Sequence, residues 1–289
     1  MDGGLIGPAE QMFLKTPEKQ IPLTGSWKLR QEHDCGNAGS DFIPQCGPGE
    51  PHTMHTLFDN MIHPLIPYAL RGVLWYQGEC NAISGAEGYQ ELLENLIDDW
   101  RGHWGQRRLD FLIIQLPGYQ RRRTVSIHSQ WALLREAQYL AGRSRDAEVI
   151  VSYDTGDEND LHPRDKHPVA LRAAERAAAL ISGREVPRSP VFSLVTFSGN
   201  VLRICFETWG GRLVFHGEPS GFAICGADGV FYPAEVRIIS DNELEVFHPG
   251  LPEPTAVYYA WSNFPTGNLY GDSGLPAVPF RWVRQPAFA

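Results

Sequence analysis

Between residues 72 and 182, short apolar runs alternate with long amphipathic segments, and no other feature constrains the fold as strongly. The apolar runs have the length of buried strands: "GVLWYQ" (72–77), "FLIIQL" (111–116) and "EVIVSY" (148–153). The amphipathic segments have the length of helices and occupy 88–104, 127–141 before Gly142, and 168–182 before Gly183. Strands joined by such helices form right-handed β-α-β units, so we expect a parallel sheet with helices on both faces.

The region before this pattern is predicted to be irregular. Residues 1–52 are loop-rich, with one predicted strand at 21–30. A helical pattern then starts at 53, but Pro64 and Pro67 must break or kink it because a proline ring cannot continue a helix.

The region after this pattern changes character at Pro187 and Pro190. Residues 191–285 contain short strand patterns separated by turn signals, which is typical of a β-sandwich. We therefore predict three parts: a loop-rich segment (1–52), an α/β core (53–186) and a β-sandwich (187–289).

Charge and hydropathy exclude two classes of partner. The net charge of −9 argues against a nucleic-acid-binding protein, and the basic run Arg121–Arg123 fits a solvated loop better than a phosphate site. No apolar run approaches the roughly 18 residues of a membrane span. The first residues, "MDGGLIGPAE", also lack the basic and apolar regions of a signal peptide.

The cysteines do not predict a metal site. Their number is odd and they form no C-x-x-C pair, so zinc is not expected. Cys35 with Cys46, or Cys205 with Cys225, could form disulfides in an exported protein, and free thiols fit the sequence equally well.

The stretch "DLHPRDKHP" (160–168) places Asp160 two residues before His162. In an extended segment both side chains would point to one face, so the carboxylate could hold the imidazole. The stretch follows a predicted parallel strand, and ligands bind beyond the carboxyl ends of such strands. We expect His162 to be a general base oriented by Asp160. A hydrated acidic loop, or a metal site that includes His162 and His167, are the alternatives.

A second polar loop, "QGECNA", follows the predicted strand at 72–76. Gln77, Glu79 and Asn81 alternate along it, and Gly78 permits close approach of the backbone. The amide of Gln77 could donate to a developing oxyanion, with help from Asn81. The alternative is a polar strand end that packs against the start of a helix.

Both loops are parts of longer sequence motifs. "LFDNMIHPLIPYALRGVLWYQGECNA" (57–82) resembles the central signature of the sialate O-acetylesterase family, a branch of the SGNH hydrolases. "QWALLREAQ" (130–138) and "YDTGDENDLHPRDKHPVALRAAERA" (153–177) are similar to its later blocks, in the same order. The similarity continues through "AVYYAWSNFPTGNLYGDSGLPAVPFRW" (256–282) and covers nearly the whole chain.

The resemblance implies an SGNH-type, flavodoxin-like parallel sheet flanked by helices and followed by a β-sandwich. It implies hydrolysis of acetyl esters on carbohydrates by a serine, with no metal or organic cofactor, in a periplasmic or secreted protein. In this family's pattern His162 is the catalytic base, Asp160 orients it and Gln77 is the oxyanion glutamine. Glu79 is then a structural carboxylate of the same loop.

One family block does not occur in the sequence. The family's nucleophile is the serine of a Gly-Gln-Ser-Asn block upstream of W-Y-Q-G-E, and this chain contains no Gly-Gln-Ser. That block also ends the first strand of the sheet, so we expect a strand and a helix to be missing with it. An open sheet edge would result, at which a second copy of the chain could pair.

No other residue is a convincing substitute for this serine. Ser26 and Ser40 lie outside any predicted strand-to-helix turn, whereas Ser84 and Cys80 are close enough to Gln77 in sequence to be considered. Three explanations stay open. The chain is a fragment of a longer esterase, it takes its nucleophile from another chain, or it is an inactive, glycan-binding relative.

Overall fold

The computed structural model describes residues 13–24, 55–66 and 68–284, and it divides into two compact units, Met1–Leu65 and Ile66–Ala289. In the first unit, β1 (Phe13–Lys15) and β2 (Gln20–Pro22) pair as an antiparallel hairpin. The strand predicted at 21–30 is described only as far as residue 24, and the rest lies outside the described residues.

The proline-interrupted helix of the first unit is irregular, as predicted. The helical pattern gives way to the π-helix η3 (Phe58–Ile62) and the 3₁₀-helix η4 (His63–Leu65). Pro64 lies inside η4, and it has no N–H with which to continue an α-helical ladder.

The second unit contains the predicted parallel sheet. Its strands lie in the order β3 (Gly72–Trp75), β4 (Asp110–Ile114), β7 (Glu148–Ile150), and both pairings are parallel. Beyond their carboxyl ends, β5 (Gly118–Tyr119) pairs in parallel with β8 (Gly156–Asp157).

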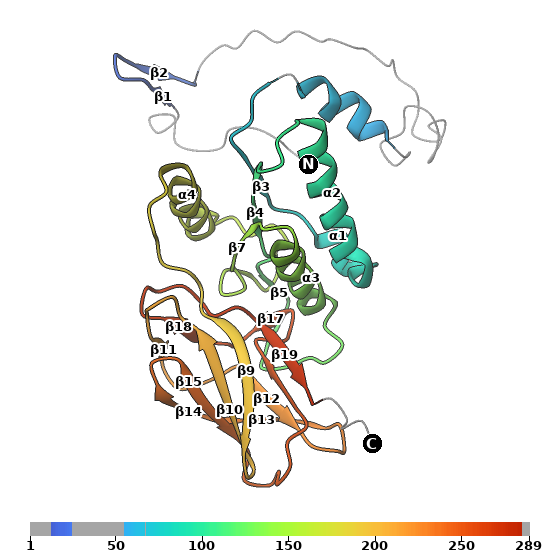
Figure 1. Ribbon diagram of the computed structural model, residues 1–289, viewed down its shortest axis with the longest axis vertical. Helices are drawn as coiled ribbons and strands as arrows, with labels where there is room; N and C mark the ends of the chain where they lie inside the picture. The colour runs from blue at the N-terminus through green and yellow to red at the C-terminus, as the bar shows by residue number, and fades with distance from the viewer. Residues whose placement is uncertain (1–12, 25–54, 67, 285–289) are drawn as a thin grey trace. The chain divides into compact units, whose positions relative to one another are not determined.

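Helices cover both faces of this sheet, which confirms the predicted α/β class (Figure 1). Phe111 and Ile113 of β4 point into a core formed with α2 (Tyr89–His103) and α3 (Gln130–Ser144). The alternate residues of β4 pack against α4 (His167–Ser182) on the opposite face. The short helices α1 (Glu79–Ile83) and η5 (Ala86–Gly88) connect β3 to α2.

The sequence predicted that the helix over 127–141 ends before Gly142, and this prediction is wrong. The helix continues to Ser144, and a Cβ added at Gly142 would lie 2.5 Å from Cγ2 of Val149 on β7. The glycine therefore permits close helix–strand packing. Gly183 does end α4, in a left-handed conformation with φ 70°.

The β3 edge of the sheet has no further strand within the described residues. Leu74 on β3 is in register with Leu112 on β4, so both side chains face the α4 side of the sheet. Leu112 is 3% exposed there, whereas Leu74 is 59% exposed. The sheet therefore ends at β3 with an uncovered apolar surface.

The C-terminal part forms the predicted β-sandwich from two antiparallel sheets that share one core. The first sheet has the order β14 (Glu235–Ser240), β15 (Glu243–Phe247), β10 (Val201–Glu207), β9 (Val191–Ser198). The second has the order β13 (Phe231–Pro233), β12 (Phe222–Cys225), β16 (Ala256–Tyr259), β19 (Phe280–Val283). A further pair is β11 (Leu213–Phe215) with β18 (Leu269–Gly271).

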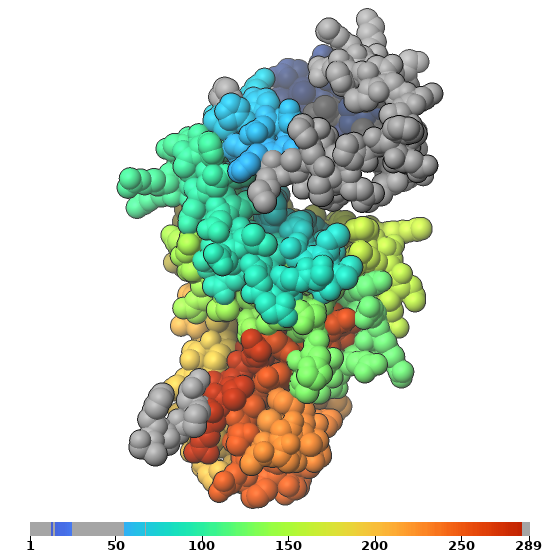
Figure 2. All heavy atoms as spheres, turned by 90° about the vertical axis from the view of Figure 1, so that its right-hand side faces the viewer, coloured from blue at the N-terminus to red at the C-terminus, as the bar shows by residue number. Residues whose placement is uncertain are grey.

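The sandwich packs directly on the loops of the α/β core. β6 (Arg122–Arg123) pairs in parallel with β17 (Phe264–Pro265), and in Figure 2 these green and red segments lie against each other. The guanidinium of Arg122 lies 4.1 Å from the centre of the Phe264 ring. The basic run is exposed, as predicted. Arg122 and Arg123 also connect the α/β core to the sandwich.

Cys205 and Cys225 are free thiols on β10 and β12, which belong to different sheets. Cys35 and Cys46 lie outside the described residues. Across the described ranges, no helix has the length and apolar character needed to cross a membrane.

Candidate active site

The two loops singled out in the sequence meet beyond the carboxyl edge of the sheet. Lys166, from the loop after β7, places its Nζ 5.4 Å from the centre of the Tyr76 ring, which follows β3. Burial lowers the pKa of Lys166, and the negative charges of Glu79 and Asp160 act in the opposite direction. Burial beside Glu79 also raises the pKa of Tyr76 to about 12. One lysine therefore lies between acidic groups from both loops.

The side chain of Gln77 is held in one orientation by its neighbours. Its Nε2 donates to Oδ1 of Asn81 at 3.0 Å, and the Tyr89 hydroxyl lies 3.0 Å from its Oε1. The same hydroxyl accepts a hydrogen bond from Nε1 of Trp75 at 3.1 Å. An amide has two N–H groups, and within the described residues only Asn81 accepts a hydrogen bond from that of Gln77.

Gly78 is required where it stands. Its φ is +149°, and an added Cβ would lie 2.7 Å from Cδ2 of Leu134 on α3. Its N–H donates to Oε2 of Glu79 at 3.0 Å, so the Glu79 carboxylate closes the turn that begins α1. The Gly78 N–H is therefore already engaged within its own turn.

Asp160 and His162 do not adopt the extended geometry predicted from their spacing. The chain bends at 161–162, and Oδ1 of Asp160 accepts the backbone N–H of His162 at 2.8 Å. This is the local side-chain-to-backbone turn that aspartate favours in loops. The His162 side chain is exposed, and within the described residues its ring makes no hydrogen bond. Asp160 thus positions the histidine through its backbone.

The other acids of this loop have structural partners. Asp154 accepts two hydrogen bonds from Arg172, at 2.7 and 2.6 Å, and a third from Tyr270 at 3.3 Å. Burial beside Asp154 raises the pKa of Tyr270 to about 12. Asp157 accepts the backbone N–H of Asn159. In the described part of the chain, no group of three or more potential ligand side chains is placed to hold a metal ion.

No serine or cysteine of the described residues hydrogen-bonds to His162. Ser84 caps the end of α1 and is exposed, and Cys80 is an exposed, free thiol on the same helix. Ser26 and Ser40 lie outside the described residues.

Three residues that support these loops were not singled out in the sequence. Tyr89 donates to Oε1 of Gln77, Lys166 lies beside the Tyr76 ring, and Gln138 donates to the carbonyl oxygen of Gln77 at 3.1 Å. Gln138 could have been found, because it lies three and four residues after Arg135 and Leu134 on the buried stripe of α3. A polar residue at a buried position usually has a specific partner.

Comparisons with known proteins agree on one family. A model of the sialic acid-specific acetylesterases, a carbohydrate esterase family, matches residues 38–177. The sialate O-acetylesterase of Homo sapiens is 30% identical over 275 residues, covering 85% of this chain and 52% of that protein. The Mus musculus enzyme is 26% identical over 281 residues, covering 87% of this chain and 52% of that protein.

A solved structure gives the same result. The crystal structure of a carbohydrate acetylesterase from Xanthomonas citri superposes with a TM-score of 0.72 at 35% identity, over 80% of this chain and 54% of that one. The chain therefore spans about half the length of the relatives it matches. On its motifs, its fold and these relatives, the chain belongs to the sialate O-acetylesterase family of carbohydrate esterases.

Proposed function

We propose that this chain supplies the base and the oxyanion donor of a carbohydrate O-acetylesterase site, to which a serine must be added. The observation that carries the proposal is the meeting of the two polar loops around Lys166, which brings the His162 loop and the Gln77 loop to one edge of the sheet. Membership of an esterase family supports the reaction type.

In the proposed reaction, a serine hydroxyl attacks the acetyl carbonyl while the imidazole of His162 takes its proton. Gln77 donates its second amide N–H to the oxyanion, with Asn81 holding the amide in place. The imidazolium of His162 then protonates the sugar oxygen as its bond to the acetyl carbon breaks, so the sugar leaves with a free hydroxyl, and His162 later activates the water that releases acetate. Asp160 fixes the backbone turn that carries His162.

The open edge of β3 supports a place for the missing serine. In flavodoxin-like sheets the strand order is 2-1-3-4-5, and the order β3-β4-β7 corresponds to its last three strands. A first strand would then pair beside β3 and end next to Gln77. Leu74, exposed beside that edge, is a surface that such a strand and its helix would cover.

The test is complementation with the part of the Xanthomonas citri acetylesterase that this chain does not match. Hydrolysis of 4-nitrophenyl acetate is measured for each part alone and for the mixture. We expect hydrolysis by the mixture, with His162→Ala reducing the rate about 10²–10⁴-fold and Gln77→Ala about 10²-fold. His167→Ala, at the first residue of α4 directly after this loop, is the matched control and should retain the rate. A His162→Ala mixture as active as the unmodified one contradicts the proposal.

A second candidate, a glycan-binding remnant without catalysis, is favoured by the lack of any described serine against His162. The two candidates differ in the complementation assay. A remnant would bind deacetylated sugars equally well with or without His162, and it would produce no acetate in any mixture.

A further inference from the structure

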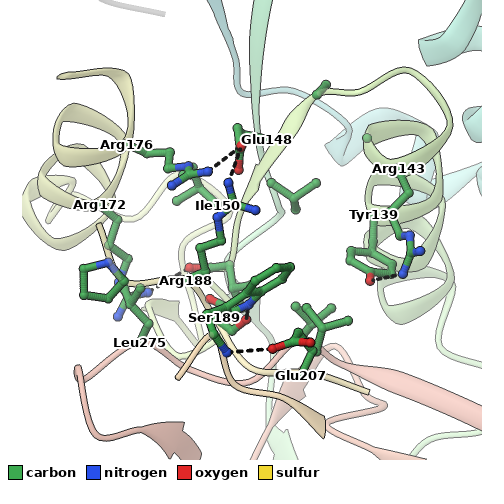
Figure 3. Close-up of a pocket in the computed structure, with 18 of the residues that line it drawn as sticks. Tyr139, Arg143, Glu148, Ile150, Arg172, Arg176, Arg188, Ser189, Glu207 and Leu275 are labelled. Carbon is green, nitrogen blue, oxygen red and sulfur yellow. Dashed lines mark hydrogen bonds and ion pairs between the residues drawn. The ribbon is translucent and has the colours of Figure 1, made fainter. Parts of the chain in front are cut away.

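A cavity lies away from the loops that carry Gln77 and His162. It has a volume of about 640 Å³, within the range of small-molecule sites. Its walls are the outer edge of β7, the end of α3, the middle of α4 and the first residues of the sandwich. Figure 3 shows Tyr139 and Arg143 on one side and Arg172 and Arg176 on the other. None of the residues proposed for the esterase reaction lines it.

Arg176 lies in the wall of this cavity and is bound to Glu148. The residue is 8% exposed, and its Nε has no hydrogen-bond partner. Its Nη2 donates to Oε1 of Glu148 at 2.5 Å, and that oxygen also lies 3.6 Å from Nη2 of Arg188. The carboxylate of Glu148 is therefore held between two guanidinium groups in the cavity wall.

Trp209 lies in the cavity wall with its indole ring fixed and half exposed. Its φ is +56°, a conformation that a bulky residue rarely adopts without support. Its backbone N–H donates to Glu207 and its Nε1 donates to the carbonyl oxygen of Ser189 at 3.2 Å. The guanidinium of Arg188 lies 4.8 Å from the ring centre, and 49% of the residue stays exposed. Strain at an immobilised, exposed aromatic residue points to ligand contact.

The charges of the lining indicate the kind of ligand. Arginines and carboxylates line the cavity in equal numbers, so it has no strong preference for an anion or a cation. Guanidinium donors beside carboxylate acceptors can both bind hydroxyl groups. An exposed indole adds an apolar face against which the C–H groups of a sugar ring can pack.

From these observations we infer that this cavity is a carbohydrate-binding site, sized for one or two sugar rings and separate from the acetylesterase site. Trp209 packs against a ring face, and the half-exposed guanidinium of Arg188 donates to a ring hydroxyl. The inference goes beyond the proposed function and does not depend on catalysis.

The test is saturation-transfer NMR with the methyl glycosides of galactose, N-acetylglucosamine and N-acetylneuraminic acid, none of which carries an O-acetyl ester. We expect at least one glycoside to bind, and Trp209→Ala to weaken its binding about tenfold. Tyr68→Ala, which removes an aromatic residue 71% exposed elsewhere on the same unit, is the matched control and should leave binding unchanged. Absence of binding by all three glycosides, or binding that Trp209→Ala does not alter, overturns the inference.

A second variant separates the cavity from the catalytic loops. Arg188→Lys keeps a positive charge near Glu148 but removes the planar guanidinium, so it should weaken binding of the same glycoside several-fold if the thermal melting curve shows that the variant folds. Binding that is lost in His162→Ala and kept in Trp209→Ala would place the sugar at the catalytic loops and overturn the inference, while leaving the proposed function intact.

Discussion

At the scale of single residues, Gly78 sets the position of the proposed oxyanion donor. Replacing it by alanine places a Cβ 2.7 Å from Leu134 and forces an L-residue to a φ of +149°. We expect Gly78→Ala to lower the free energy of unfolding by about 1–3 kcal/mol, measured by urea denaturation. Gly102→Ala is the control, because Gly102 lies in the last turn of α2 and a Cβ there meets nothing within 4 Å. Equal stability of the two variants would contradict this account.

The sequence predicted that the loops of Gln77 and His162 lie at one edge of the sheet, but it did not predict how Asp160 contacts His162. The prediction assumed an extended segment, in which residues two apart share a face. Aspartate in a loop instead competes for nearby backbone N–H groups, and here it takes that of His162. Residue spacing specifies a side-chain pair only where the backbone conformation is already known.

At the scale of elements, α3 joins the core to the sandwich through Arg135. This fully buried side chain donates to the carbonyl oxygens of Leu116, Pro117, Ser262 and Asn263. Burial lowers its pKa to about 9, but four carbonyl oxygens around a planar guanidinium favour its charged form.

Loss of these four hydrogen bonds of Arg135 should destabilise the second unit. Lysine cannot reach four acceptors in one plane, so we expect Arg135→Lys to lower the free energy of unfolding by about 2–4 kcal/mol. Arg281→Lys is the control, because Arg281 also joins α3 to the sandwich, through Glu136, but is 40% exposed. It should cost about 1 kcal/mol or less. Thermal melting of both variants compares the two arginines, and an equal loss of stability in both would contradict the prediction for the buried Arg135.

A second element-scale prediction concerns acid stability. On β15, Glu245 accepts hydrogen bonds from Arg237 and Arg203, and these bonds hold its pKa below the ordinary value of 4.5. A carboxyl group with a depressed pKa stabilises the fold above 4.5 and loses that contribution as pH falls through the depressed value. The melting temperature of the unmodified chain should therefore fall more between pH 6 and pH 3 than that of Glu245→Gln. Parallel curves would show that Glu245 does not contribute.

The helices and strands were predicted well where a hydrophobic periodicity continues over many residues. They were predicted poorly at a glycine, because a glycine can either end a helix or permit close packing within it. The parallel order of β3, β4 and β7 follows from strands joined by helices. Gly142 was read as a helix stop, since sequence alone does not show that Val149 approaches it. The partners of Arg135 were equally hidden, because they lie more than 100 residues away along the chain at Ser262 and Asn263.

At the scale of the whole molecule, the open edge of β3 should make the protein associate. Leu74 is 59% exposed beside an edge strand, which is a surface that another chain can cover. We expect the mass measured by light scattering to rise with concentration in the micromolar range, and Leu74→Lys to suppress that rise. Leu92→Lys is the matched control, since Leu92 is 58% exposed on α2, which covers the face of the sheet opposite to Leu74. A constant monomer mass for the unmodified chain would contradict the prediction.

The central claim is that His162 and Gln77 act on a serine that the recognised motifs of this chain do not contain. Its most direct test is labelling with a fluorophosphonate probe, followed by mass spectrometry of the adduct. The account predicts no adduct on any serine of this chain alone. In the mixture with the unmatched part of the Xanthomonas citri acetylesterase, it predicts an adduct on that part, formed more slowly when His162 is replaced by alanine. An adduct on a serine of this chain, formed without the partner, would contradict the account and identify the nucleophile.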